Sequence, residues 1–124
     1  MVDKPYAPID KTIADEAYTL VSGGRQESYS HPVDNFRRIA SIWSGILDID
    51  VTEAQVGLCM AGMKLAREGF KHQRDNLVDA VGYILTTDAV VQTFNNIDKQ
   101  VNDYERTAPL LRGLEPYPGN DAVQ

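Results

Sequence analysis

The spacing of apolar residues is the sequence feature that most restricts how this chain can fold. Apolar residues recur at intervals of three and four along most of the chain, as they do on one face of an α-helix. No run of four or more residues alternates with the period of two that is typical of a half-buried strand. The sequence therefore predicts an all-α fold, an antiparallel bundle of four to five helices joined by short loops.

Start and stop signals divide the chain into helical segments. The first begins at Asp10 and stops at the Ser-Gly-Gly of residues 22–24, and the second covers about 32–47, with Pro32 in its first turn. Thr52 and Gln55 have the spacing of a capping box, which begins a third segment that ends near Gly69. We expect the buried stripe of this third segment to contain Val56, Cys59, Met60, Met63 and Ala66.

The fourth segment begins near Asp75 and continues through Ile84. Residues 86–88, Thr-Thr-Asp, permit a break or a bend before a fifth segment, whose apolar stripe is Val90, Phe94, Ile97, Val101 and Tyr104. Residues 1–9 are expected to form an arm, and residues 109–124, rich in proline and glycine, an irregular tail. Residues 1–124 are thus predicted to form a single helical domain.

Composition limits the classes of partner. A net charge of −6 and a pI of about 4.7 argue against broad binding to nucleic acid, because a phosphate backbone would be repelled at long range. No apolar run approaches the roughly 18 residues of a membrane span, and residues 1–10 do not resemble a secretory signal. We therefore expect a cytoplasmic protein. A small phosphate ligand stays compatible with this charge, since it needs only two or three local cations.

Two cations in the third segment could provide such a site. Lys64 and Arg67 are three positions apart and share one helix face. The planar guanidinium of Arg67 suits phosphate oxygens, and the Lys64 ammonium acts as a movable point charge. The alternative is that both side chains only cover the edge of the core with their apolar stems.

Acidic and amide side chains in the fourth segment could complement these cations. Asp75 and Asp79 are four positions apart, and Asn76 lies three positions before Asp79. Paired carboxylates are ligands that Mg²⁺ prefers, so these residues form a candidate magnesium site. The alternative is that Asp75 caps its helix while Asp79 pairs with Lys64 or Arg67 across the bundle.

The loop before the second segment supplies further polar candidates. Arg25, Gln26 and Tyr29 lie where a loop can fold over the mouth of a bundle, and Asn35 lies at the margin of the second segment's apolar stripe. We expect all four residues to contribute to ligand binding.

Four segments of the chain resemble a family of small phage and prophage proteins: "RQESY", "NFRRIASIWSGIL", "VGLCMAGMKLAR" and "RDNLVDAVGYI". The resemblance covers residues 25–83. The polar positions that match the family pattern are Arg25, Gln26, Tyr29, Asn35, Lys64, Arg67, Asp75 and Asp79. Ser30 stands where the family pattern has glycine.

The same region is remotely similar to the MazG-like all-α nucleoside triphosphate pyrophosphohydrolases. That resemblance implies a magnesium-dependent reaction that yields a monophosphate and pyrophosphate, with Asn76 and Asp79 of "NLVD" at the later acidic motif. At the first motif the chain offers only Asp34 and Asn35, so nucleotide binding is better supported than hydrolysis. The alternative is a non-catalytic phage accessory protein that sequesters a nucleotide signal or binds a host protein. MazG-like relatives complete their pockets across subunits, which implies a homo-oligomer.

Overall fold

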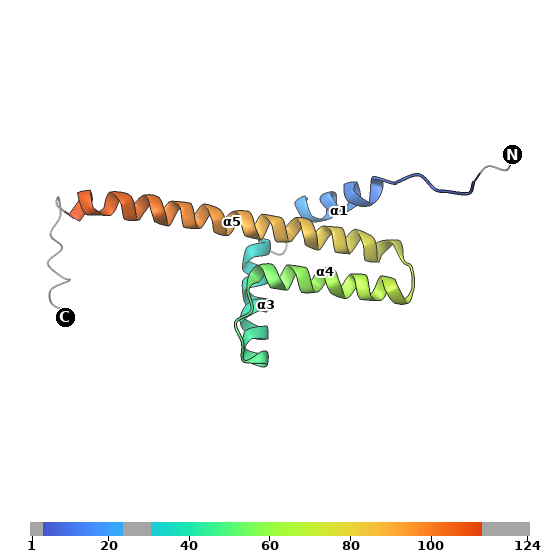
Figure 1. Ribbon diagram of the computed structural model, residues 1–124, viewed down its shortest axis with the longest axis horizontal. Coiled ribbons are helices and arrows are strands. Elements are labelled where there is room, and N and C mark those ends of the chain that lie inside the picture. Colours follow the sequence, from blue (N-terminus) through green and yellow to red (C-terminus); the bar gives the residue numbers. More distant parts are fainter. Residues whose placement is uncertain (1–3, 24–30, 113–124) are drawn as a thin grey trace. The chain divides into compact units, whose positions relative to one another are not determined.

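The computed structural model describes residues 4–23 and 31–112, with side chains described as far as Arg106. The chain divides into two compact units, Met1–Val91 and Gln92–Gln124, and each is described by itself. The described residues form four helices and contain no strand: α1 (Thr12–Ser22), α3 (Pro32–Leu47), α4 (Glu53–Phe70) and α5 (Arg74–Arg112). The predicted all-α fold is confirmed (Figure 1).

Two helix starts follow directly from local sequence chemistry. At the start of α3, the Val33 N–H donates to His31 Nδ1 at 3.1 Å, and Pro32 occupies the first turn, where its missing N–H costs nothing. At the start of α4, the Gln55 N–H donates to Thr52 Oγ1 at 3.1 Å, and the Thr52 N–H donates to Gln55 Oε1 at 2.9 Å. The predicted capping box is therefore confirmed.

We expect Thr52→Ala to lower the free energy of unfolding by about 1 kcal/mol, because the substitution leaves an N–H of the first turn of α4 without its acceptor. Thr52→Ser keeps the hydroxyl and should stay within about 0.5 kcal/mol of the wild type. Urea denaturation of the three proteins checks this. Equal stability of the alanine and serine variants would contradict the role of the capping box.

A short, well-defined connection joins α3 to α4. Asp48 adopts a left-handed conformation (φ 55°) directly after α3. The Ser44 hydroxyl accepts from the Val51 N–H at 2.8 Å and donates to the Val51 carbonyl oxygen at 3.4 Å. These bonds fix the connection, so that α3 runs crosswise to α4 (Figure 1).

The helix α5 is continuous where the sequence permits a break. The Thr86 hydroxyl donates to the Gly82 carbonyl at 2.8 Å, and the Thr87 hydroxyl donates to the Tyr83 carbonyl at 2.7 Å. Both hydroxyls are thus satisfied within the helix and need no break. The helix also continues to Arg112, past the position where the irregular tail was expected to begin.

The core of the first unit consists mainly of small side chains. Its largest fully buried members are Val56, Val78 and Val90. At Gly57 of α4, an added Cβ would lie 1.9 Å from Thr87 Oγ1, so the two helices approach each other closely there. The first part of α5 lies antiparallel beside α4 (Figure 1). Small residues on both helices make this spacing possible.

This close approach explains where the predicted stripes were wrong. On α4 the buried residues are Val56, Gly57 and Ala61, whereas Cys59, Met63 and Ala66 of the predicted stripe are exposed. The packing face is centred on Gly57, because Thr87 of α5 and the Phe36 ring lie so close to it that a side chain there would not fit. Helical spacing also predicts a stripe of Phe36, Ile39, Trp43 and Ile46 on α3; there Phe36 is buried, but Ile46 is 74% exposed.

Candidate functional site

A polar seam continues the apolar contact between α4 and α5 towards the turn that joins them. We define it as Lys64 and Glu68 of α4 together with Asn76 and Asp79 of α5. Lys64 follows Ala61 by three positions and Glu68 follows Lys64 by four, so both extend the buried side of α4. The seam is therefore built by the same helix periodicity that forms the core.

An ion pair lies at the centre of the polar seam. Lys64 Nζ lies 2.9 Å from Asp79 Oδ2, and the two side chains are 17% and 39% exposed. The sequence offers this pairing as the alternative to two separate roles, in which Lys64 binds phosphate and Asp79 binds magnesium. Both groups remain partly open to solvent, so a ligand could reach them.

Glu68 organises the end of the seam nearest the turn. Its Oε1 accepts from the Gln73 N–H at 2.8 Å, and its Oε2 pairs with His72 Nδ1. The Asn76 side chain, which is buried (7% exposed), also hydrogen-bonds to Glu68. The hydrogen bond to His72 and then the bond from Gln73 lower the pKa of Glu68. The carboxylate thus holds together the end of α4, the turn and the start of α5.

The lowered pKa of Glu68 predicts acid sensitivity. A carboxyl group whose pKa is lower in the folded state stabilises the fold above its unfolded-state pKa of about 4.3, and this contribution is lost as the pH falls through the lower folded value. We therefore expect Glu68→Gln to reduce stability at neutral pH and to flatten the loss of stability on acidification. Thermal unfolding across the acid range measures both effects.

Asp88→Asn provides the control for this experiment, since Asp88 is exposed and lies outside the seam. We expect this variant to follow the wild-type pH profile. If Glu68→Gln also followed it, the proposed contribution of the Glu68 carboxylate would be wrong.

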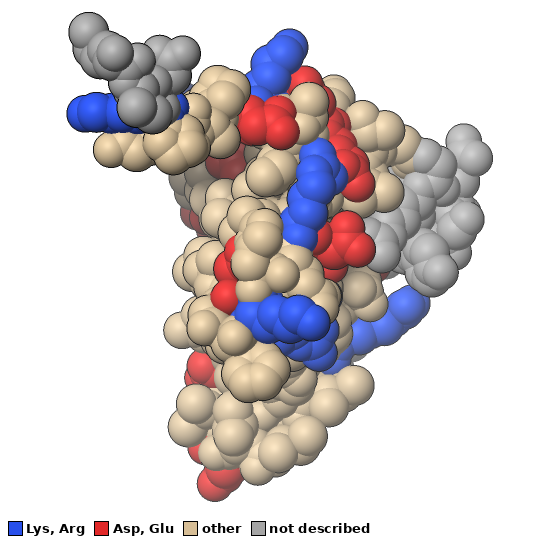
Figure 2. Space-filling view, turned by 90° about the vertical axis from the view of Figure 1, so that its right-hand side faces the viewer, with Lys and Arg blue, Asp and Glu red and all other residues tan. Residues whose placement is uncertain are grey.

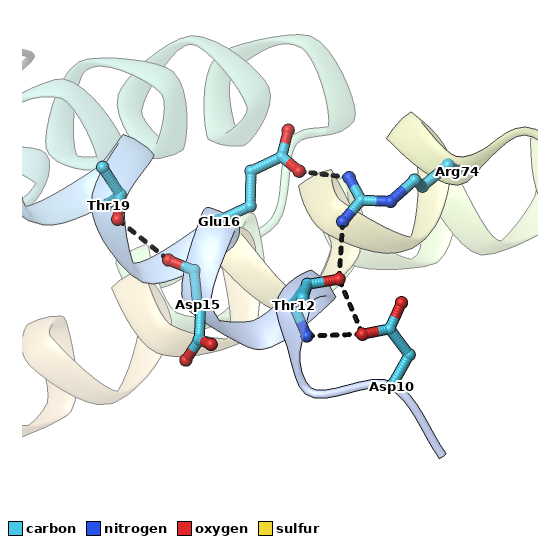
Figure 3. A network of polar contacts seen from close by, with 6 residues as sticks. All are labelled: Asp10, Thr12, Asp15, Glu16, Thr19 and Arg74. Carbon is cyan, nitrogen blue, oxygen red and sulfur yellow. Dashed lines mark hydrogen bonds and ion pairs between the residues drawn. The ribbon is translucent and has the colours of Figure 1, made fainter. Parts of the chain in front are cut away.

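A second polar network attaches α1 to the start of α5 (Figure 3). The Arg74 guanidinium forms an ion pair with Glu16 and donates to Thr12 Oγ1 at 3.1 Å. The Thr12 hydroxyl and N–H both donate to Asp10 Oδ1, at 2.7 and 2.9 Å. The bonds from Thr12 lower the pKa of Asp10, and the bond to Glu16 raises that of Arg74. This network joins residues that are more than fifty positions apart.

Sequence reasoning did not identify Arg74, Glu16 or Glu68 as parts of these networks. Glu68 could have been found, because it lies four positions after Lys64 on the same helix face. The pairing of Arg74 with Glu16 carries no local signal, since 58 positions separate the two residues.

The predicted site residues are only partly brought together. Lys64, Asn76 and Asp79 lie in the polar seam. Arg67 is exposed near the end of α4, Asp75 is exposed in the first turn of α5, and Asn35 is exposed on α3. Arg25, Gln26 and Tyr29 lie outside the described residues.

The sequence also offers Asp75 and Asp79, with Asn76 beside them, as a candidate magnesium site. Within residues 4–23 and 31–112, no group of three or more His, Cys, Asp or Glu side chains is placed to hold a metal ion. Asp79 is engaged by Lys64, and Asp75 is exposed to solvent. Mg²⁺ usually keeps several waters and needs only one or two carboxylates when a substrate phosphate supplies further oxygens. The described residues therefore do not form a complete metal site by themselves.

Charges of both signs are interleaved on one face of the molecule. Figure 2 shows Lys and Arg side chains directly beside Asp and Glu side chains, with uncharged surface around them. In the part of the chain that the structure describes, no helix is both long and apolar enough to cross a bilayer.

The fold and the seam together define a small all-helical domain with an apolar centre and an ionic end. Residues 12–91 match the sequence profile of a family described as a domain of unknown function, DUF6378, and this chain belongs to that family. The match ends at the same residue as the first compact unit. The family therefore corresponds to the first unit and not to the second.

A phage relative supports the expected similarity to phage proteins. The chain is 37% identical over 76 residues to the "Gene 55 protein" of Mycobacterium phage D29, across 60% of this chain and 50% of that relative. The matched region thus spans about half the length of the phage protein. No solved structure matches the chain.

Proposed function

We propose that this chain binds a nucleotide or a related small phosphate ligand at the polar seam. The observation that carries the proposal is the partly buried ion pair of Lys64 and Asp79. Removing charges from water is costly, and an apolar pair of similar volume often stabilises a fold as well or better. Ionic groups next to a core of valine and alanine are therefore better explained by recognition of a ligand than by stability alone.

The arrangement suggests how a phosphate would bind. Asp79 holds the Lys64 ammonium at the edge of the seam, where a phosphate oxygen could replace the carboxylate or share the ammonium with it. Arg67, three positions further along α4, is exposed and can supply a planar pair of donors. Arg25, Gln26, Tyr29 and Asn35 are assigned to the ligand from the sequence alone, through their positions and the family resemblance.

Binding is proposed in preference to hydrolysis. MazG-like conversion of a nucleoside triphosphate to a monophosphate and pyrophosphate requires enough carboxylates to hold magnesium and orient water. Asp75 and Asp79 offer two, and Asp79 is engaged by Lys64. Magnesium could still arrive bound to the phosphates of the ligand, with Asp75 or Asp79 as a protein ligand.

A second candidate function rests on the end of α3 and the start of the connection that follows it. Ile42, Ile46 and Leu47 of α3 and Ile49 of the connection are between 58% and 74% exposed. A group of exposed apolar side chains is typical of a protein-binding surface. This observation favours the alternative of a non-catalytic phage accessory protein that binds a host protein.

A nucleotide panel tests the proposal. The pure protein is titrated calorimetrically, and its melting temperature is measured, with nucleoside mono-, di- and triphosphates in the presence and absence of Mg²⁺. We expect at least one class to bind and to raise the melting temperature, because a ligand that binds only the folded state stabilises it. Pyrophosphate release is measured in the same samples. If no pyrophosphate were released, hydrolysis would be excluded, but the proposal of nucleotide binding would stand. If no nucleotide bound or shifted melting, the seam would lose its proposed role and the protein-binding candidate would be favoured.

A further inference from the structure

The second unit contains an amphipathic helix whose apolar side has a coiled-coil spacing. We define the α5 stripe as Phe94, Ile97, Val101 and Tyr104, whose intervals are three, four and three. These intervals place the four residues at alternating a and d positions of a heptad repeat. The stripe therefore has the geometry that packs against a matching helix with a small left-handed crossing angle.

Burial changes along the heptad repeat of α5. In the first unit, Ala80 and Thr87 occupy the preceding a positions and Val90 the preceding d position, and all three are buried. In the second unit, Ile97 is 40% exposed, Val101 48% and Tyr104 66%. None of residues 92–106 is buried. The repeat that packs inside the first unit thus continues along α5 as an exposed apolar surface.

The opposite side of this part of α5 is polar. Arg106 forms an ion pair with Asp103, and these residues occupy f and c positions of the repeat, which face away from the stripe. Lys99 occupies the preceding f position. A helix with one apolar stripe and one charged face depends on packing of the stripe for most of its stability.

The residues that flank the stripe indicate which partner fits. The e positions hold the acidic residues Asp98 and Glu105, and the g positions hold Thr93 and Gln100, which are uncharged. In a parallel pair of identical helices, each e position faces the preceding g position of the other copy, so Glu105 faces Gln100 and Asp98 faces Thr93. In an antiparallel pair, e positions face e positions, and acidic residues would oppose one another.

We propose that the α5 stripe forms a parallel two-stranded coiled coil with a second copy of this chain. Two copies bring identical 3.5-residue repeats together, so that the a and d side chains of each helix fill the holes of the other. The parallel arrangement is favoured because it matches each acidic position with an uncharged polar one. The proposal is independent of the ligand site, since it concerns the second unit, and it gives a specific surface to the homo-oligomer expected from the sequence.

Sedimentation equilibrium of the full chain over a wide concentration range tests the association. We expect a reversible dimer whose dissociation constant rises at least about 100-fold in Ile97→Asp, because the substitution would bury an unpaired carboxylate at a d position. Asn96→Asp adds the same charge at the neighbouring c position and should change the constant by less than about threefold. Circular dichroism establishes that each variant keeps its helices, and Val101→Asp replaces Ile97→Asp if that variant does not fold.

The parallel orientation has a separate test. In a Cys59→Ser background, Phe94→Cys and Tyr104→Cys are oxidised one at a time. A parallel pair brings each position close to its own copy, so both variants should form disulfide-linked dimers. An antiparallel pair can bring at most one of them together. A monomer at all concentrations, a dimer unaffected by either aspartate substitution in the stripe, or cross-linking at only one position would overturn the proposal.

Discussion

Replacing Gly57 with valine is expected to unfold the first unit under conditions in which the wild type is fully folded. A Cβ at this position would lie 1.9 Å from Thr87 Oγ1 and 3.0 Å from Cε2 of the Phe36 ring. Neither neighbour can move away easily, since Thr87 is buried in α5 and Phe36 is 4% exposed. The helices would have to separate, and the buried valines between them would lose contacts.

Gly57→Ala measures the same effect on a smaller scale. Alanine normally stabilises a helix by about 0.5–1 kcal/mol relative to glycine, but overpacking here should reverse the sign and cost about 1–3 kcal/mol. Gly62 is the matched control, because it lies on the same helix and a Cβ there would meet nothing within 4 Å. Gly62→Ala should therefore stabilise the protein by about 0.5–1 kcal/mol in urea denaturation. Equal effects of the two alanine substitutions would show that the close approach does not restrict the fold.

A double-mutant cycle identifies the atom responsible. Thr87→Ala removes the hydroxyl nearest to the new Cβ, but Thr87 Cβ would still lie 3.1 Å from it. We therefore expect Thr87→Ala to relieve part of the damage from Gly57→Ala, with a coupling of about 1 kcal/mol. Additive effects would place the strain elsewhere, in the contact with Phe36.

The second large effect is expected at Lys64. Lys64→Met should abolish binding of the nucleotide class identified by the panel and should lower the free energy of unfolding by about 1–2 kcal/mol, because Asp79 loses its partner in a partly desolvated setting. Asp79 is 39% exposed, so water limits this cost. Calorimetric titration measures the binding, and urea denaturation measures the stability.

The double variant Lys64→Met with Asp79→Leu separates the two roles. With both charges removed, stability should return close to the wild-type value, while ligand binding should stay absent. Lys11→Met is the control, since Lys11 pairs with Asp15 at 3.7 Å on the exposed side of α1. It should change stability by less than about 0.5 kcal/mol and leave binding intact. Full binding by the double variant would exclude the ion pair from the ligand site.

The starts of α3 and α4 could be predicted because they depend on residues two or three positions apart. Pro32 and the pair of Thr52 and Gln55 are sufficient for these starts. The continuity of α5 could not be predicted in the same way, because Thr86 and Thr87 are compatible either with a break or with hydrogen bonds to carbonyls one turn earlier. The buried environment of the helix decides between these two outcomes.

The packing face of α4 depends on a residue of another helix, and periodicity alone does not reveal it. Helical spacing of the apolar residues favoured Cys59 and Met63, but the observed face follows Gly57 because Thr87 of α5 lies against it. The candidate site likewise contains one pairing that the sequence could offer and one that it could not. The pairing of Lys64 with Asp79 was an available alternative from the sequence, whereas the pairing of Arg74 with Glu16 required the fold.

The attachment of α1 has a consequence for the order in which the first unit opens. At 11 residues, α1 is shorter than the roughly 12–15 residues that an isolated helix needs to be even marginally stable in water. Ala17 is its single buried residue, and the ion pair with Arg74 lies at an exposed position. Detachment of α1 would expose little apolar surface and would melt the whole segment at once. Amide hydrogens in α1 should therefore exchange with solvent through such a local opening, ahead of those at the contact between α4 and α5.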